Sequence, residues 1–82
     1  MRYTVTCPQD IQDKLALMWI QATDKGAVSR ASKRIDILLR HSPERGVDQG
    51  THWTLVVDPL MVLYTVSPDD YRVEILDFIY SG

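Results

Sequence analysis

The first seven residues, "MRYTVTC", alternate between polar side chains and larger apolar or aromatic ones. This two-residue period is typical of a strand that buries one of its faces. Pro8 interrupts the pattern. The sequence therefore predicts an N-terminal strand, after which the period of the apolar positions changes.

Two helical stripes follow. Between about residues 8 and 23, apolar side chains recur every three or four positions, at Ile11, Leu15, Met18, Trp19 and Ala22. A second stripe with the same spacing comprises Val28, Ala31, Ile35, Leu38 and Leu39. Pro43 ends the second helix, because the residue before a proline avoids the helical region. The few polar residues between the stripes predict two antiparallel helices.

Three short β-rich runs, at about residues 52–57, 61–66 and 71–78, follow a polar loop. The turns between them are short, so these strands must be antiparallel neighbours. The predicted fold is an α+β domain with the order β-α-α-β-β-β, in which a helical hairpin packs on one face of a mainly antiparallel four-stranded sheet. The 82 residues fit one domain, over residues 1–82.

Alternation along the runs assigns side chains to the two faces of the sheet. The face toward the helices should carry Trp53, Leu55, Val57, Val62, Tyr64, Val66, Tyr71, Val73 and Ile75. The open face should carry His52, Thr54, Val56, Leu63, Thr65, Arg72, Glu74 and Leu76. Because Ile75 and Leu76 are both apolar, the last strand either is buried on both sides near its end or changes parity at a bulge.

Charge is distributed unevenly along the chain, whose net charge is −2. Residues 1–49 contain eight Lys or Arg and six Asp or Glu, whereas residues 50–82 contain one and five. The second helix should carry a basic ridge of Arg30, Lys33, Arg34 and Arg40. Such a ridge is either a solvated face or a surface for phosphates or for an acidic partner.

Cysteine and hydropathy patterns exclude several kinds of protein. Cys7 is the one cysteine, so no internal disulfide can form, and no Cys/His spacing predicts a zinc site. No apolar run approaches the roughly 20 residues of a membrane span, and the N-terminus lacks the apolar segment of a signal peptide. We therefore expect a cytoplasmic protein that does not enter the membrane and needs neither a metal nor another cofactor.

Several segments together resemble a known family. They are the first strand "MRYTVT", the helix end "RIDILLRHSPERG", the strand "PLMVLYTV" and the closing "DDYRVEILDFIYS". Over essentially the whole chain they are similar to the RelE/ParE toxins of bacterial type II toxin–antitoxin pairs. The resemblance implies a RelE-like sheet and a cognate antitoxin as partner. It also implies a cellular target, which is mRNA in the ribosome for RelE-type members and DNA gyrase for ParE-type members.

Cleavage of RNA by a RelE-type toxin would need a proton carrier and a cation beside the reacting phosphate. The open face offers His52 as acid or base, Arg72 as phosphate clamp and Tyr80 as a stacking or proton-carrying group, with Arg45 as a further RNA-binding residue. Both residues also have a purely structural interpretation, in which His52 is a surface histidine at a strand end and Arg72 pairs with an acid across strands. Since the sheet is short of cations, a ParE-type gyrase inhibitor and a catalytically impaired antitoxin-binding relative stay open.

Antitoxin binding requires something apolar to cover. Val56, Leu63 and Leu76 on the open face are the candidate antitoxin-binding residues, and a groove beside the helices is the alternative. The basic ridge of the second helix could attract the acids of the antitoxin segment. Because so short a chain buries a modest core, we expect the isolated protein to be marginally stable or to form a weak homodimer.

Overall fold

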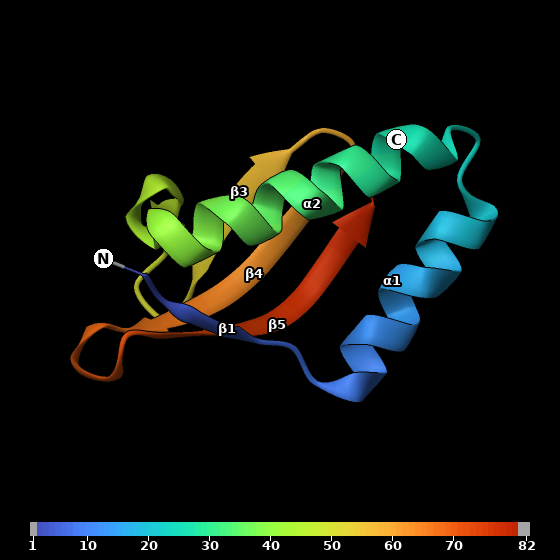
Figure 1. Ribbon diagram of the computed structural model, residues 1–82. Helices are drawn as coiled ribbons and strands as arrows, with labels where there is room; N and C mark the ends of the chain where they lie inside the picture. The colour runs from blue at the N-terminus through green and yellow to red at the C-terminus, as the bar shows by residue number, and fades with distance from the viewer. Residues whose placement is uncertain (1, 81–82) are drawn as a thin grey trace.

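The computed structural model describes residues 2–80 (Figure 1). Over this range the chain forms β1 (Thr4–Thr6), α1 (Gln9–Gln21), α2 (Lys25–His41), the 3-10 helix η1 (Pro43–Arg45), β2 (Val47–Asp48), β3 (Trp53–Val57), β4 (Leu60–Ser67), the 3-10 helix η2 (Pro68–Asp70) and β5 (Arg72–Tyr80). The predicted α+β class and the two-helix arrangement are confirmed.

The sheet has the strand order β1-β5-β4-β3-β2. β1 runs parallel to β5, and the other neighbours are antiparallel. The described sheet therefore has five strands where the sequence predicted four. The missed strand is β2, in which Val47 pairs with Thr54 and Asp48 with Trp53. Two residues are too few to show a two-residue period, so alternation alone cannot distinguish this strand from the polar loop.

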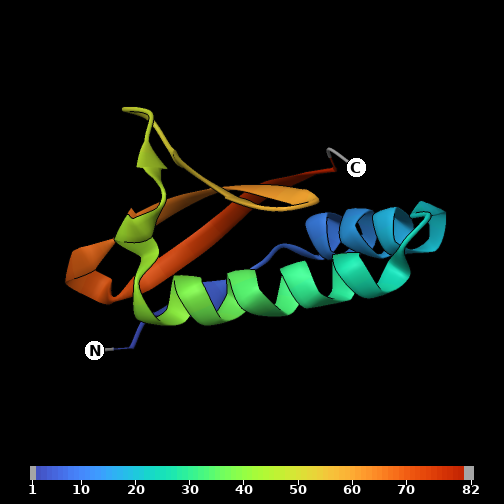
Figure 2. The same ribbon diagram turned by 90° about the horizontal axis from the view of Figure 1, so that it is seen from above.

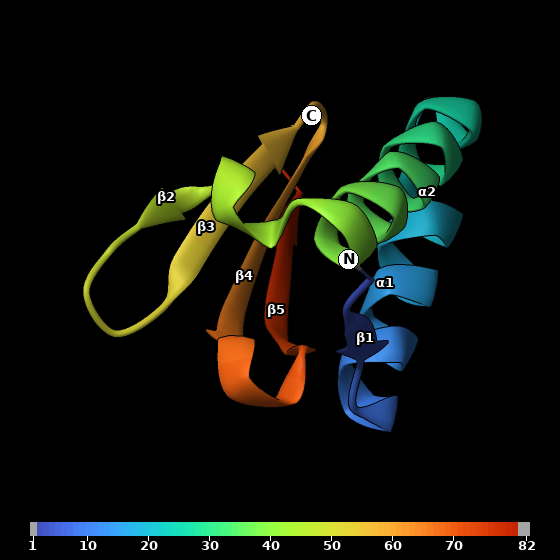
Figure 3. The ribbon, with the colours of Figure 1, turned by 60° about the vertical axis from the view of Figure 1, so that its left-hand side comes forward.

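The two helices lie together on one face of the sheet, and the other face is left open (Figures 2 and 3). α2 supplies four buried side chains to the core, namely Val28, Ala31, Ile35 and Leu39. The sheet supplies Leu60, Val62, Tyr64, Val73, Ile75 and Phe78. No residue of α1 is buried, and its apolar stripe packs only partly against the core. α1 is therefore the less firmly packed of the two helices.

Sequence features explain where α2 begins and ends. The Asp24 carboxylate accepts a hydrogen bond from the Ala27 backbone N–H at 3.0 Å, so Asp24 caps the helix. Arg40 and His41 occupy the last turn, where a positive charge is favourable. Pro43 then opens η1.

A bulge in β5 resolves the two alternatives for the end of that strand. Tyr64 lies opposite Ile75, and Leu63 lies opposite Asp77, so Leu76 is the extra residue. Ile75 and Phe78 are buried, whereas Leu76 is exposed on the open side. The parity of β5 therefore changes at Leu76, and strand positions beyond it face the opposite way from a simple alternation.

Tyr71 departs from the predicted alternation. Its backbone is left-handed, with φ of 49°, at the end of η2. The side chain is exposed and meets the Tyr3 ring edge-on, with 5.6 Å between ring centroids. The prediction that Tyr71 faces the helices was wrong, because Tyr71 has a left-handed backbone conformation at the end of the turn and the strand begins only at Arg72.

Tyr64 ties η1 to the middle of the sheet. Its hydroxyl donates a hydrogen bond to the Pro43 carbonyl, and the side chain is fully buried. Burial, and secondarily the charge of Glu44, raises the pKa of this hydroxyl. A Cβ on Gly46 would stand 2.1 Å from the Tyr64 hydroxyl and 2.6 Å from the Thr54 carbonyl oxygen. The Gly46 backbone lies so close to the Tyr64 hydroxyl and the Thr54 carbonyl that only glycine fits at this position.

Candidate functional site

The open face of the sheet divides into two halves along the strands. Cross-strand pairing places an apolar set toward the turn between β3 and β4, comprising Val56, Met61, Leu63, Leu76 and Ile79. Toward the other end lies a polar set, comprising Thr4, Thr6, His52, Thr65, Ser67, Arg72 and Glu74. We call these the apolar half and the polar half. One face of a single sheet thus offers a surface for an apolar partner beside a surface for polar chemistry.

His52 stands at the entrance of β3, in a hollow of about 190 Å³ that Thr65 also lines. Its Nδ1 lies 3.0 Å from the Thr51 hydroxyl. Thr65 pairs with Glu74 on β5, so a residue that lines the same hollow as His52 is the cross-strand neighbour of Glu74. Two strand spacings, roughly 10 Å, separate β3 from β5. His52 and Glu74 can therefore reach one small group that lies between them.

Arg72 lies on the same face, two residues before Glu74, and its side chain is exposed. Within residues 2–80 the ion pairs are Lys14–Asp77 and Arg40–Asp36, so Arg72 has no carboxylate within ion-pairing distance there. The described residues therefore contain no cross-strand ion pair of Arg72 with an acid. The guanidinium is available to an external anion.

Tyr80 is not brought to this group. It pairs with Leu60 at the far end of β5 and packs against the core. Eight residues of strand, roughly 25 Å, separate it from Arg72. The prediction that Tyr80 lies near His52 and Arg72 was wrong, because Tyr80 lies at the opposite end of β5 and the bulge at Leu76 reverses the face of the sheet on which its side chain lies.

Arg45 is likewise distant from the polar half. It ends η1 immediately before Gly46 and β2, and three strand spacings, roughly 14 Å, separate β2 from β5. The side chain is exposed. Arg45 can therefore contact only a ligand that extends beyond the sheet edge, not the group between His52 and Glu74.

The three residues predicted to meet an antitoxin all lie in the apolar half. Val56 is 64% exposed and Leu76 39% exposed, and Leu63 is half-buried between them on β4. Sequence reasoning missed Met61 and Ile79, which pair with each other in the same region. Ile79 could not be placed without the bulge, and Met61 follows from the alternation that already placed Leu63. The apolar half is thus larger than predicted.

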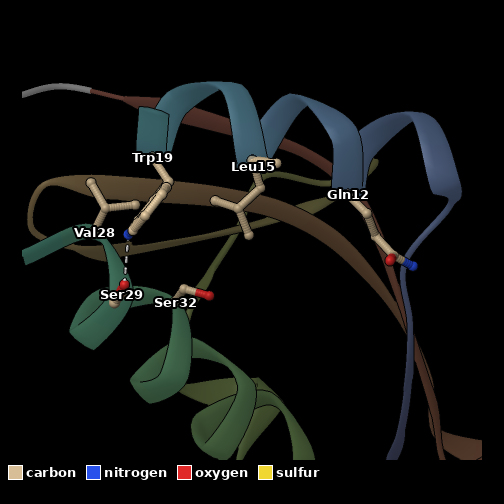
Figure 4. A pocket seen from close by; sticks show the side chains of 7 residues that line it. Gln12, Leu15, Trp19, Val28, Ser29 and Ser32 are labelled. Atoms are coloured by element: carbon tan, nitrogen blue, oxygen red, sulfur yellow. Dashed lines mark hydrogen bonds between the residues drawn. The ribbon is translucent and has the colours of Figure 1, made fainter. Parts of the chain in front are cut away.

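α1 and α2 form a second apolar feature, on the covered side of the sheet. A groove of about 340 Å³ runs between them and is lined by Gln12, Leu15, Ala16, Trp19, Val28, Ser29 and Ser32 (Figure 4). The Trp19 indole N–H donates to the Ser29 hydroxyl at 2.9 Å and crosses one end of the groove. On the outside of α1, Leu17 and Ile20 are 55% and 58% exposed.

Cys7 is half-buried at the start of α1. Burial, and secondarily the Asp10 carboxylate, raises the pKa of its thiol. Such a thiol is a poor nucleophile near neutral pH.

Two further findings concern residues 2–80. No group of three or more His, Cys, Asp or Glu side chains there could hold a metal ion. None of the helices in this range has the length and apolar character needed to cross a membrane.

No protein-family model matches the chain, and no curated protein sequence does. Solved structures match it throughout. One chain of the RelBE2 toxin–antitoxin complex of Mycobacterium tuberculosis is 14% identical, with a TM-score of 0.75, and the match covers 98% of this chain and 99% of that one. One chain of an archaeal RelE–RelB complex from Pyrococcus horikoshii is 20% identical, with a TM-score of 0.70, and the match covers 100% of this chain and 98% of that one. A mutant of the Escherichia coli toxin RelE in the free state is 12% identical, with a TM-score of 0.69, and the match covers 100% of this chain and 86% of that one. The chain therefore has the fold of the RelE toxins.

Proposed function

We propose that this protein is the toxin of a toxin–antitoxin pair and that it arrests translation by cleaving mRNA on the ribosome. The observation that carries the proposal is the RelE fold over the whole described chain, whose open sheet face keeps a cation and proton-carrying groups together. The solved RelE proteins from M. tuberculosis and P. horikoshii are in complexes with an antitoxin or with RelB. The site of action would be the cytoplasm, where ribosomes are.

The polar half supports one order of events at a phosphodiester. Glu74 takes the proton from a ribose 2′-hydroxyl, and the 2′-oxygen forms a bond to phosphorus. Arg72 balances the negative charge of the five-coordinate phosphorus. The bond from phosphorus to the 5′-oxygen then breaks, and His52 supplies the proton that this oxygen takes up. A 2′,3′-cyclic phosphate and a free 5′-hydroxyl result, and no oxidant or metal is required.

Few cations lie on this face, so the protein would rely on the ribosome to hold the mRNA. Arg72 alone represents positive charge after residue 50, against five acids. A phosphate chain is repelled by such a surface unless something else positions it. We therefore propose activity on ribosome-bound mRNA and little activity on free RNA.

The apolar half is the proposed antitoxin-binding surface. An apolar segment laid on Val56, Leu63 and Leu76 would extend toward the polar half along the same strands and block it. Neutralisation by steric cover is the expected mechanism.

Inducible expression tests the proposal. Wild-type protein should stop growth, and pulse labelling should show loss of protein synthesis before loss of DNA synthesis. His52→Ala combined with Arg72→Ala should restore growth at equal protein level. Val56→Asp should remain toxic but escape the antitoxin, whereas Leu17→Asp, an equally exposed position on α1, should remain toxic and still be neutralised. Normal growth with wild-type protein present would refute the proposal.

One observation favours a second candidate, a ParE-type protein that inhibits DNA gyrase by binding it. α1 exposes Leu17, Trp19 and Ile20, and Trp19 also lines the groove of Figure 4. Apolar side chains gathered on a helix suit a protein target rather than RNA. In this case DNA synthesis stops first, Leu17→Asp abolishes toxicity, and the His52 and Arg72 substitutions have no effect.

A further inference from the structure

The outer side of α2 carries cations around an exposed aliphatic side chain. A hollow of about 500 Å³ is lined by Arg30, Lys33, Arg34, Ile37 and Leu38. A smaller hollow of about 210 Å³ shares Arg30 and Arg34, and it continues to Val57 and Asp58 at the end of β3. We call the surface of Arg30, Lys33, Arg34, Ile37 and Leu38 the α2 basic face. It belongs to α2, which lies on the opposite side of the sheet from the open face (Figure 3).

Charge is concentrated on this helix. α2 contains five Lys or Arg and one acid, whereas the rest of the chain contains four Lys or Arg and ten acids. Arg40, predicted as part of the ridge, is bound to Asp36 at 2.9 Å. Within residues 2–80, Arg30, Lys33 and Arg34 have no carboxylate at ion-pairing distance. Three cations on one helix face thus repel one another, and an external anion would relieve that repulsion.

An apolar side chain lies among these cations. Ile37 is 54% exposed, and Leu38 is half-buried beside it. No aromatic ring lines either hollow, whereas surfaces for single-stranded RNA typically stack bases on aromatic rings. Cations around an aliphatic floor fit a ligand that has both carboxylates and an aliphatic side chain. Such ligands are acidic amphipathic peptide segments.

We propose that the α2 basic face binds an acidic amphipathic segment of a partner protein. An aliphatic side chain of that segment covers Ile37 and Leu38, and its carboxylates pair with Arg30, Lys33 and Arg34. Arg30 and Ile37 are seven residues apart, so two turns of α2, roughly 10 Å, are engaged. This spacing matches a partner helix with acids and an apolar residue every three to four positions. The inference concerns binding alone and requires none of the RNA chemistry proposed above.

Fluorescence anisotropy with a labelled synthetic peptide tests the proposal. The probe is a 16-residue helical peptide of Glu, Leu and Ala, with Leu at every third or fourth position, about as long as α2 itself. Wild-type protein should bind it, and Ile37→Ser and Arg34→Glu should each weaken binding by about 10-fold. The matched controls are Ile20→Ser on α1, 58% exposed, and Arg2→Glu near the N-terminus. Both should bind within about 2-fold of the wild type.

Two more probes separate the outcomes. A scrambled peptide of the same composition, which carries the same charge without the apolar stripe, should bind at least about 10-fold more weakly. Single-stranded oligouridine should also bind more weakly than the striped peptide. Equal affinity for all three probes, or Ile37→Ser binding as the wild type does, would show a surface for polyanions and overturn the proposal. Circular dichroism of each variant checks that α2 is intact, so that loss of binding is not loss of fold.

Discussion

Gly46 is the position at which a single methyl group should disturb this fold most specifically. The substitution Gly46→Ala places a Cβ 2.1 Å from the Tyr64 hydroxyl and 2.6 Å from the Thr54 carbonyl oxygen. One neighbour is a fully buried aromatic ring, and the other is backbone of β3. Neither belongs to a flexible side chain that can move aside at low cost. The native arrangement cannot accept the methyl group without displacing the Tyr64 ring or β2.

Two effects set the size of the loss. Overpacking of a close-packed site costs about 1–3 kcal/mol. If the Tyr64 ring moves away, the Pro43 carbonyl loses its donor, which costs about 1–3 kcal/mol more. A loss of about 2–6 kcal/mol is a large share of the 5–15 kcal/mol typical of a folded domain. For a chain of this size it lowers Tm by at least about 8 °C.

Urea unfolding, followed by tryptophan fluorescence, measures this loss. The signal is suitable because the Trp53 ring stacks on Tyr64, with 6.4 Å between centroids. Gly26→Ala is the matched control. It lies in the first turn of α2, and the nearest atom to its Cβ, at 3.0 Å, belongs to the flexible side chain of Arg30. Replacing this glycine by alanine should therefore change the unfolding free energy by less than about 1 kcal/mol.

A double substitution checks the cause. Tyr64→Phe removes the hydroxyl that the new methyl would meet, so Gly46→Ala with Tyr64→Phe should lose less stability than the sum of the two single variants. The Thr54 contact persists, so the double variant should stay below the wild type. If Gly46→Ala unfolds within about 0.5 kcal/mol of the wild type, or if the two losses add, the hydroxyl contact does not constrain the fold as argued.

Three further predictions concern the two raised pKa values and the ion pair between α1 and β5. The pKa of Tyr64 is raised above its ordinary 10.0, so its contribution is complete below pH 10 and is lost as the pH rises further, because the unfolded chain releases the proton first. Between pH 9 and pH 11, at constant ionic strength, wild-type protein should therefore lose more stability than Tyr64→Phe; equal losses would contradict this. Cys7 should react with iodoacetamide at pH 8 more slowly in the native protein than in urea, because its pKa is raised from 9.0; equal rates, measured by mass spectrometry, would refute the assignment. Lys14→Ala should cost less than about 1 kcal/mol, because the side chains of the 2.7 Å Lys14–Asp77 pair are 45% and 36% exposed to solvent; a larger loss of unfolding free energy would show that this pair holds α1 to β5.

The predictable parts of the fold are those that local sequence patterns indicate, such as the spacing of apolar residues and the lengths of turns. The buried stripe of α2 follows from a spacing of three and four residues, and Val28, Ala31, Ile35 and Leu39 are all buried. The antiparallel order of β3, β4 and β5 follows from short turns. Adjacent apolar residues at positions 75 and 76 signalled a break in parity, but only the pairing with β4 shows that the break is a bulge.

The parts that were not predictable depend on contacts between distant segments. Simple alternation places Tyr80 on the open face, but the bulge at Leu76 reverses the faces of the later residues of β5. The need for glycine at position 46 arises from a ring on β4, and the Tyr64 hydroxyl meets a carbonyl 21 positions earlier in the chain. Neither contact leaves a period in the sequence.

Cleavage of ribosome-bound mRNA by the polar half of the open face can be measured directly. Purified protein is added to ribosomes stalled on a defined mRNA, and primer extension maps any break. We expect breaks with the wild type, none with His52→Ala combined with Arg72→Ala, and few on the same mRNA without ribosomes. Intact mRNA with the wild type, or equal cleavage by the double variant, would contradict it.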